Sequence, residues 1–253
     1  MANSTFRSIL DVRSAEGLWA LKPSHFVDRE ITIGEFTHML KLRDAFWQYE
    51  GEPRPEQPHA LTRDGMCTDG FVDTLRLLCL SNICEILGGQ MLAQVRKVTV
   101  LKPFQWTISA ANAGIDLGHE VGRQARTNIA FTEKDKDGNP TVWKRFTVAE
   151  GETVLIVNEL MTTAHGSTYM AKAAVRDQNK VQPVRFMPVT AVLVNRSADT
   201  ETLEDGTPVV ARFRYHMHTY QPGPATCKYC AAGSPSIKPK VEGNWEKYFA
   251  SAI

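Results

Sequence analysis

The sequence predicts an α/β protein with a mostly parallel sheet flanked by helices. Short runs rich in apolar and β-branched residues alternate with segments that can form helices. Runs of this kind are typical of strands buried on both sides, and their alternation with helices indicates βαβ units. In such sheets ligands bind at the carboxyl ends of the strands. The predicted strands are residues 104–108, 128–131, 153–157 and 190–194, and the predicted helices include residues 114–124 and 167–177.

The composition is that of a globular protein. Of the 253 residues, 43% are hydrophobic and 23% are charged, which suffices for one large domain or for one domain with an appended piece. The 29 basic residues nearly cancel the 28 acidic ones, so no chain-wide field favours nucleic acid or a membrane as a partner. No apolar run approaches the roughly 20 residues that span a bilayer, and a secretory signal is lacking at the start. We therefore expect a cytoplasmic protein.

The first half of the chain contains one predicted boundary and one predicted helix. Residues 50–59 are polar and rich in proline, and they separate an N-terminal extension from the rest. After them, apolar residues recur at helical spacing from Leu75 to Leu87, and the pair Gly88 and Gly89 is a typical helix stop. The predicted division is an extension at residues 1–57, a core at 58–200 and a C-terminal part at 201–253.

The C-terminal part begins with an alternating segment. In residues 209–217, apolar side chains such as Phe213 and Tyr215 alternate with Arg212, Arg214 and His216. This pattern predicts a half-buried strand with a basic outer face. Exposed charges are usual in proteins, so the simplest interpretation of that face is a solvated surface.

Residues 153–168 carry the main functional signal. A buried strand is followed by Asn158 and Glu159, and then by a turn of small and hydroxyl-bearing residues that opens a helix. Backbone N–H groups and hydroxyls at such a turn form a cradle for an anion, and a phosphate monoester suits it. The preceding amide and carboxylate could accept hydrogen bonds from ribose hydroxyls. An ordinary helix cap uses the same residue types, and that alternative stays open. The predicted cradle consists of Thr162, Thr163, Ala164, His165, Gly166 and Ser167.

This segment resembles the phosphoribosyl pyrophosphate motif of type I phosphoribosyltransferases. In that motif a strand is followed by two acidic or polar residues, two apolar residues, Thr-Thr and a small turn. Further segments resemble the orotate branch of the family, in family order across about residues 58–240. They are residues 60–73 with Arg63 and Phe71, the pyrophosphate loop and its helix at 109–124, the mobile catalytic loop at 131–146, residues 193–197 with Arg196, and the Cys-x-x-Cys tail at 227–240.

The resemblance implies a fold, a reaction and an assembly. The fold would be a Rossmann-like, mostly parallel sheet flanked by helices, with a small hood formed by N- and C-terminal segments. The reaction would transfer ribose 5-phosphate from phosphoribosyl pyrophosphate to orotate, with Mg²⁺ bridging pyrophosphate and ribose oxygens. The family's lid usually serves the neighbouring subunit, so the resemblance also implies a homodimer.

The resemblance also implies roles for individual residues. Lys134 and Lys136 would lie on a basic lid that closes over the leaving group, and Glu159 would act beside the ribose. A charged hairpin is more often only solvated, so the lid depends on the resemblance. Phosphoribosyl pyrophosphate would be bound by Asn158, Glu159, the predicted cradle, Ala111, Asn112, Lys144 and Arg145. The base would be bound by Arg63, Phe71, Thr162 and Arg196.

The chain departs from the family pattern in both phosphate-binding segments. Asn158 stands where the family has a second acidic residue, the turn after Thr-Thr is longer, and Asn112-Ala113 replaces a glycine pair. The amide can still accept a hydroxyl, but it helps a developing positive charge less. Two alternatives therefore stay open: transfer to a different base, or a non-catalytic protein that senses phosphoribosyl pyrophosphate or a nucleotide.

The cysteines leave a further question open. Five are present, an odd number, and most are scattered, which favours reduced thiols over a disulfide framework. Only Cys227 and Cys230 form a pattern. With His216 and His218 they would complete a Cys₂His₂ zinc set, although a tail without metal is the simpler interpretation that the resemblance supplies.

Overall fold

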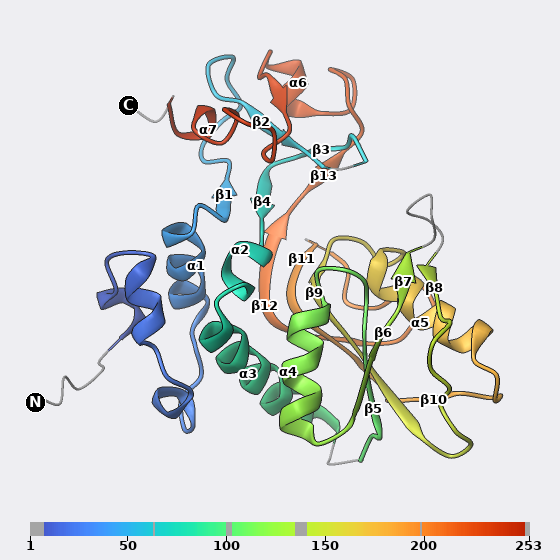
Figure 1. Cartoon of the computed structure of the whole chain (residues 1–253). Helices are drawn as coiled ribbons and strands as arrows, with labels where there is room; N and C mark the ends of the chain where they lie inside the picture. The colour runs from blue at the N-terminus through green and yellow to red at the C-terminus, as the bar shows by residue number, and fades with distance from the viewer. Residues whose placement is uncertain (1–7, 63, 100–102, 135–140, 198, 251–253) are drawn as a thin grey trace, which may run out of the picture.

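The computed structural model describes residues 8–62, 64–99, 103–134, 141–197 and 199–250. Its centre is a sheet of six strands, all paired in parallel (Figure 1). The strands are β5 (Trp106–Ser109), β6 (Asn128–Phe131), β9 (Thr153–Met161), β10 (Arg185–Phe186), β11 (Thr190–Ser197) and β12 (Val209–Met217). Their order is β12-β11-β9-β5-β6, and β10 pairs with the start of β9. The predicted α/β class and parallel sheet are confirmed.

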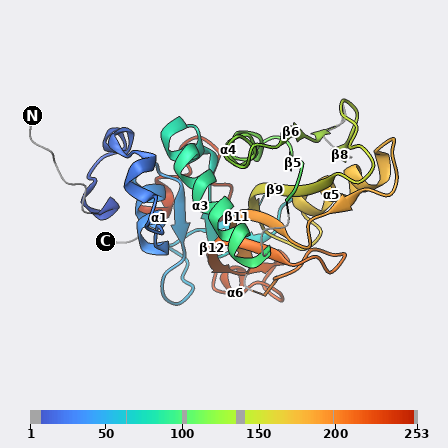
Figure 2. The ribbon, with the colours of Figure 1, turned by 90° about the horizontal axis from the view of Figure 1, so that it is seen from below.

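Helices cover both faces of this sheet. They are α3 (Ser81–Thr99) and α4 (Ile115–Ala125) on one face and α5 (Ser167–Gln178) on the other. Along β9, Leu155 and Val157 pack in the same cluster as the apolar residues of α3 and α4, whereas Val154 and Ile156 pack with those of α5. Successive strand residues point to opposite faces, so the uninterrupted apolar run of β9 is explained by burial on both sides. Figure 2 shows α3 lying between α1 (Ile33–Leu42) and α4.

The predicted helix stop at Gly88 and Gly89 is wrong. The helical region instead begins with the short α2 (Leu75–Leu78), and α3 then runs straight through both glycines to Thr99. A Cβ atom at Gly88 would lie 2.9 Å from Glu120 Cβ, and one at Gly89 would lie 2.8 Å from Gln124 Oε1. The glycines therefore do not end the helix; they let α4 approach α3 closely.

Replacing Gly88 with valine should destabilise the protein through this helix contact. The new side chain would meet Glu120 Cβ, and overpacking of this kind costs about 1–3 kcal/mol. Chemical denaturation should show a lower free energy of unfolding for Gly88→Val. The control is Ala93→Val, an exposed position of the same helix, where only the small helix-propensity difference remains. Equal losses in the two variants would contradict the packing role of Gly88.

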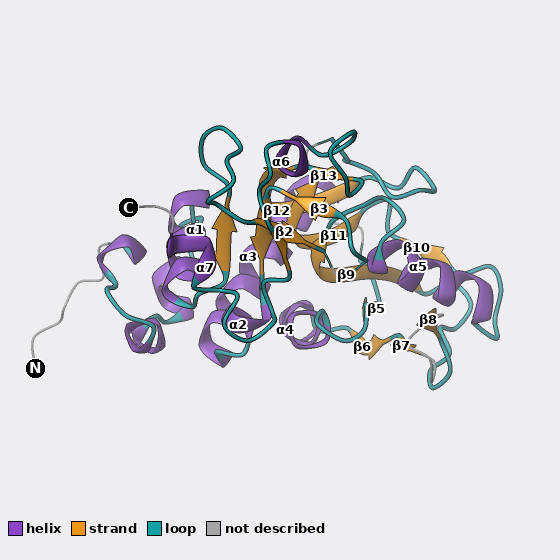
Figure 3. Cartoon of the chain, turned by 90° about the horizontal axis from the view of Figure 1, so that it is seen from above, coloured by secondary structure: helices purple, strands orange, loops and turns teal. Residues whose placement is uncertain are grey.

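A second sheet forms the hood above the main sheet (Figures 1 and 3). Its order is β13-β3-β2-β14, so it joins strands from residues 59–68 to strands from residues 219–237. A pair of strands, β1 and β4, and the short helices α6 and α7 complete this region. The elements are β1 (Phe46–Gln48), β2 (His59–Leu61), β3 (Cys67–Thr68), β4 (Gly70–Val72), β13 (Thr219–Tyr220), α6 (Lys228–Ala231), β14 (Ser236–Ile237) and α7 (Lys247–Ala250). The hood has its own aromatic cluster, which includes Trp47, Tyr49, Tyr229 and Tyr248.

The predicted division of the chain can be placed on these elements. β12 belongs to the main sheet, so only the part of 201–253 that follows it lies in the hood. Within the extension, residues 9–42 form η1 (Ile9–Asp11), η2 (Glu16–Ala20), η3 (Pro23–Phe26) and α1, and their apolar residues join the cluster that contains α3 and the sheet, whereas Trp47 and Tyr49 join the aromatic cluster of the hood. Within the described residues, no helix is long and apolar enough to cross a membrane.

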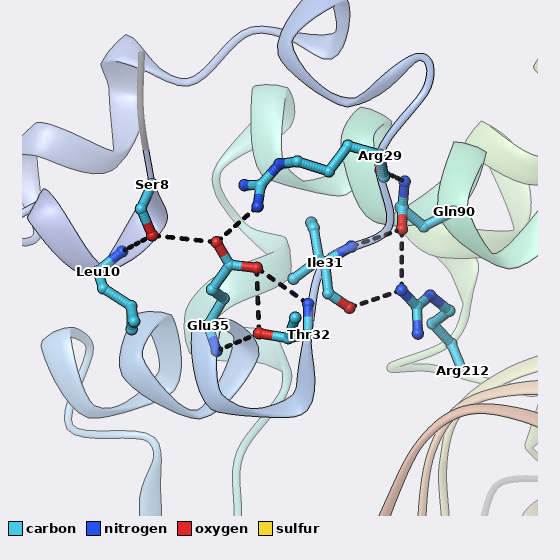
Figure 4. A network of polar contacts seen from close by, with 8 residues as sticks. All are labelled: Ser8, Leu10, Arg29, Ile31, Thr32, Glu35, Gln90 and Arg212. Atoms are coloured by element: carbon cyan, nitrogen blue, oxygen red, sulfur yellow. Dashed lines mark hydrogen bonds and ion pairs between the residues drawn. The ribbon is translucent and has the colours of Figure 1, made fainter.

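The extension also covers part of β12, which corrects the prediction of a solvated basic face. Arg214 and His216 are exposed, but the Arg212 side chain is only 9% exposed. Its guanidinium donates to the carbonyl oxygen of Ile31 at 2.6 Å and to Gln90 Oε1 at 3.0 Å (Figure 4). The sequence pattern of β12 could not reveal this contact, because Ile31 lies in an irregular segment about 180 residues earlier.

Candidate active site

A cleft opens at the carboxyl ends of β9 and β11, where the hood faces the main sheet. Its volume is about 280 Å³, and its lining comes from the turn after β9, the end of β11 and β13. This is the edge at which parallel α/β sheets bind ligands. A larger hollow of about 470 Å³ lies beside Thr153 and Arg185, where β9 and β10 begin, so its place in the fold makes it the weaker candidate. The first cleft is lined by Thr162, Thr163, Ser197, Asp199, His218 and Tyr220, among others.

The turn after β9 is open to solvent. Thr163, His165 and Ser167 are exposed, and the turn leads through Gly166 into α5. No side chain caps α5 at Gly166 and no acidic residue lies in its first turn, so the described residues leave its first N–H groups available to an anion. This geometry favours the cradle over the capping alternative. The imidazole of His165 pairs with the carboxylate of Glu204, which holds it at the surface of the turn.

The side chain of Asn158 supports the turn from within. It is 2% exposed, and its Nδ2 donates to Ser167 Oγ at 3.0 Å and to Thr168 Oγ1 at 2.9 Å. Its Oδ1 accepts the backbone N–H of Glu159 at 2.9 Å. Both ends of the amide are engaged within the protein, and the oxygen keeps a second lone pair, so the direct contact of Asn158 with ribose stays a prediction. Its buried position also gives a physical reason for an uncharged residue here, since burying an ionised group costs far more.

Glu159 lies beside two hood residues that the sequence analysis missed. Its carboxyl group is half-buried and accepts the backbone N–H of Leu160. The pKa of Glu159 is raised to about 7, mainly by burial and also by the negative charge of Asp73, while the backbone N–H groups of Leu160 and Glu159 and the charge of Lys240 oppose the rise. Lys240 Nζ forms an ion pair with Asp73 at 2.9 Å. Asp73 and Lys240 lie in the segments 60–73 and 227–240, which already resembled the family. Nothing in either segment indicated that these two residues meet at the end of β9.

The residues predicted to bind the base meet around Arg196. This residue lies next to the last position of β11 and is 6% exposed, and its Nε donates to Thr162 Oγ1 at 3.2 Å. Its Nη1 donates to the carbonyl oxygen of Gly70 at 2.9 Å, beside Phe71. Burial lowers the pKa of Arg196 from its very high ordinary value, which does not remove its charge. Phe71 packs edge-on against Trp245, with ring centroids 5.8 Å apart. Arg63 lies outside the described residues.

The predicted pyrophosphate loop packs directly against the end of β9. Gly114, which precedes α4, lies so close to Asn158 that an added Cβ would be 2.8 Å from Asn158 Oδ1 and 3.0 Å from the carbonyl oxygen of Ala110. Asn112 is exposed, Ala111 is half-buried and the peptide bond between them is cis. The two predicted phosphate-binding segments are therefore neighbours, joined through the amide of Asn158.

The predicted lid is described only at its base. β7 (Glu133–Lys134) and β8 (Thr141–Val142) pair in antiparallel fashion beyond β6, as expected of a hairpin. Lys134 and Lys144 are exposed, whereas Arg145 forms an ion pair with Glu133 at 2.6 Å. Lys136 lies outside the described residues. The base of the hairpin thus presents two exposed lysines.

The tail brings its cysteines to residues other than those predicted. Ligand atoms of His59, Cys67, Cys227 and Cys230 all lie within 4.8 Å of one another. The predicted partners His216 and His218 do not belong to this group. They lie on and just after β12, and His218 Nδ1 contacts Asp69 Oδ2 at 3.0 Å instead. The predicted Cys₂His₂ set is therefore wrong in its histidines, because strand β2 and not β12 lies beside the Cys-x-x-Cys turn.

Comparison with known proteins agrees with this arrangement. No family model matches the chain. The chain is 27% identical over 197 residues to a protein of a Nitratiruptor species named orotate phosphoribosyltransferase, covering 74% of this chain and 92% of the relative. A protein of the same name from Heliobacterium modesticaldum is 28% identical over 181 residues, covering 72% and 88%.

A solved structure shares the fold. The crystal structure of orotate phosphoribosyltransferase from Aeropyrum pernix aligns with a TM-score of 0.50 at 15% identity, covering 71% of this chain and 93% of that one. At 15% identity the structural similarity supports the fold alone. The sequence similarity to the two curated relatives is an independent observation. Together they identify the chain as a homologue of orotate phosphoribosyltransferases with the type I phosphoribosyltransferase fold.

Proposed function

We propose that this protein is an enzyme that transfers ribose 5-phosphate from phosphoribosyl pyrophosphate to orotate, giving orotidine 5′-phosphate and pyrophosphate. The observation that carries the proposal is the end of β9. There Glu159 is followed by a solvent-open turn whose helix lacks a side-chain cap, at the edge of the cleft. A phosphate monoester suits such a turn, and the adjoining carboxylate suits the hydroxyls of its sugar.

The chain's own residues would act mainly by positioning and by charge. The bond between ribose C1 and the pyrophosphate oxygen breaks through a transition state with positive charge on the sugar, which the carboxylate of Glu159 would stabilise. The backbone at Ala111 and Asn112 would hold the pyrophosphate. Mg²⁺ would neutralise the oxygens of this leaving group, and Glu159 and Asp199, which lines the cleft, offer the hard oxygen ligands that it prefers.

The choice of base rests on Arg196, Thr162 and Phe71. Arg196 donates two of the five N–H groups of its guanidinium, one to Thr162 and one to Gly70. It therefore keeps donors for the carboxylate of orotate, in a place where burial strengthens a charged hydrogen bond. The second candidate is transfer to a base that lacks the carboxylate, in which case the two bonds to Thr162 and Gly70 would be the whole role of Arg196.

A single assay separates these possibilities. The protein is incubated with phosphoribosyl pyrophosphate, Mg²⁺ and one of a panel of pyrimidine and purine bases, and the release of pyrophosphate is measured. We expect release with orotate and little with uracil, which lacks the carboxylate. Release with another base would replace the proposed acceptor. Tight binding of phosphoribosyl pyrophosphate in calorimetry without release from any base would favour a sensor.

Removal of the lid lysines should lower turnover much more than substrate binding. Lys134→Ala combined with Lys136→Ala removes two positive charges that we propose close over the leaving pyrophosphate. We expect kcat to fall at least about tenfold, since one charged contact in a transition state is worth ~1.5–3 kcal/mol. Steady-state kinetics separates kcat from KM. The control is Lys180→Ala, an exposed lysine after α5, and unchanged activity of the double variant would contradict the lid.

We also propose that the enzyme is a cytoplasmic homodimer whose lid reaches the partner's site. Mixing the lid double variant with an inactive Glu159 variant tests this directly. If each lid serves the other subunit, one hybrid site contains neither substitution, and random mixing should restore roughly a quarter of the normal activity. A mixture that stays inactive although sedimentation shows hybrid dimers would contradict the sharing. Sedimentation of a monomer at assay concentrations would contradict the dimer.

A further inference from the structure

Four side chains in the hood have the residue types and positions of a metal site. His59 comes from β2 and Cys67 from β3, and these strands are antiparallel neighbours. Cys67 stands opposite Leu61, two residues from His59, so both side chains project from the same face of the pair. Cys227 and Cys230 come from the turn that opens α6. His59, Cys67 and Cys227 are buried and Cys230 is half-buried.

Three of the distances between these atoms lie within about 0.3 Å of the edges of a tetrahedron around zinc, and all four atoms lie within 4.8 Å of one another. Bonds of about 2.3 Å to sulfur and about 2.05 Å to nitrogen give ligand separations of about 3.8 Å between two sulfurs and about 3.6 Å between sulfur and nitrogen. Here Cys67 Sγ and Cys230 Sγ are 3.7 Å apart. His59 Nε2 lies 3.6 Å from Cys230 Sγ and 3.9 Å from Cys227 Sγ.

The imidazole of His59 is held with its free lone pair toward the sulfurs. Ser234 Oγ donates its one hydrogen to the carbonyl oxygen of Gln57 at 2.6 Å. Ser234 Oγ can therefore only accept from His59 Nδ1, which lies 2.9 Å away. The proton of the neutral ring is thereby placed on Nδ1, and Nε2 faces the cysteines as an acceptor. Metal-bound histidines are usually oriented by a hydrogen bond of this kind from the other ring nitrogen.

A disulfide explains this arrangement less well. All five cysteines are free, and the sulfur separation of 3.7 Å is far from the 2.05 Å or so of a bond. A disulfide would also use only two of the three cysteines, and it would not explain why His59 Nε2 faces the sulfurs. Three sulfurs and one oriented nitrogen are the complete ligand set of a closed structural zinc site.

We propose that His59 Nε2 and the Sγ atoms of Cys67, Cys227 and Cys230 bind one zinc ion. The three thiols release their protons to solvent as the ion binds, and the closed four-ligand set leaves no position for substrate. The ion would fasten the segment 59–67 to the tail at 227–230. That tail continues to Lys240, the partner of Asp73, so the ion would hold the hood in place beside Glu159. The proposal is independent of the base that the enzyme uses.

Metal analysis of the purified chain tests the site. The protein, made without a histidine tag, is refolded or dialysed with zinc under reducing conditions, and bound zinc is measured by elemental analysis and native mass spectrometry. We expect one zinc per chain. Replacement by Co²⁺ should give the intense near-ultraviolet charge-transfer absorption of thiolate ligands. Absence of tightly bound zinc, or a mass showing a Cys67–Cys230 disulfide in the reduced preparation, would overturn the proposal.

Variants identify the ligands. Cys67→Ser and His59→Ala should lose the bound zinc, whereas Cys79→Ser, an exposed cysteine outside the cluster, and His218→Ala should keep it. Zinc retained by Cys67→Ser, or lost by His218→Ala, would contradict the assigned ligands. If a ligand variant fails to fold, alkylation of the wild-type chain still tests the site. Zinc should protect Cys67, Cys227 and Cys230 from alkylation but not Cys79. Peptide mass mapping with and without a chelator measures this protection. Equal labelling of all four cysteines would contradict the site.

Discussion

Glu159→Gln should abolish most of the activity while leaving the fold intact. Glutamine keeps the shape of the side chain and can still accept the N–H of Leu160, but it lacks the negative charge proposed to stabilise the sugar in the transition state. Loss of one such charged interaction is worth ~1.5–3 kcal/mol, so kcat/KM should fall roughly 10- to 150-fold. The control is Glu150→Gln, an exposed carboxylate in the turn before β9. Activity of Glu159→Gln equal to that of the control would remove Glu159 from the mechanism.

The raised pKa of Glu159 adds a pH test to this variant. The ionised carboxylate accepts hydroxyl hydrogen bonds more strongly than the protonated acid does, so binding of phosphoribosyl pyrophosphate should strengthen as the pH rises through about 7. Stability should respond in the opposite direction. The folded protein holds this proton more tightly than the unfolded chain, whose carboxyl has a pKa near 4.5, so the contribution is complete below pH 4.5 and is lost as the pH rises through about 7.

Both slopes should disappear in Glu159→Gln. Titration calorimetry between pH 6 and 8 measures how the affinity for phosphoribosyl pyrophosphate changes with pH. The substrate itself also titrates, and the same measurement on Glu159→Gln gives that contribution, which is subtracted. Thermal unfolding over a wider range measures the stability slope. A variant that retains the binding slope of the wild-type protein would show that another group titrates.

Gly114→Ala should disable both phosphate-binding segments at once. The added Cβ would lie 2.8 Å from Asn158 Oδ1 and 3.0 Å from the carbonyl oxygen of Ala110, and the latter is backbone that cannot rotate away. Displacement of Asn158 would disturb its bonds to Ser167 and Thr168, and so the turn that we propose for the phosphate. A misplacement of about 1 Å can cost on the order of 100-fold in rate.

Kinetics and thermal unfolding together give the measurement for Gly114→Ala. We expect kcat/KM to fall on the order of 100-fold, with a stability loss within the ~1–3 kcal/mol typical of overpacking. Gly34→Ala is the matched control, because a Cβ there would meet only Thr32 Oγ1, at 4.0 Å. Full activity in Gly114→Ala would show that the loop tolerates the shift and does not hold pyrophosphate through this contact.

The parts of the fold predicted from sequence are those with a strong local pattern. The strands β5, β6, β9 and β11 and the helices α4 and α5 each have a clear pattern within about ten residues. The hood could not be predicted in the same way, because its strands have only two or three residues, and β13 and β14 pair with strands more than 150 residues earlier. Gly88 shows a second limit, since only the position of α4 explains a glycine inside a helix.

The same distinction holds for the site. Glu159 and the turn after it are continuous in sequence, so their spacing is enough to place them together. The direction of the Asn158 side chain depends on the hydroxyls of Ser167 and Thr168, and a sequence pattern carries no such direction. His59 was missed because the histidine that contacts Cys230 lies 171 residues before it, whereas two other histidines lie nearby in the chain.

The amide of Gln90 ties an irregular stretch of backbone to the core. Its Nε2 donates to the carbonyl oxygens of Phe26 and Arg29, and its Oε1 accepts from the N–H of Ile31 and from Arg212. One side chain of a central helix thus satisfies three backbone groups, at the end of η3 and in the irregular segment after it. The apolar residues from Ile9 to Phe46 consequently share their cooperative unfolding with the catalytic sheet, and a shortened chain that lacks them would lose part of the enzyme's interior.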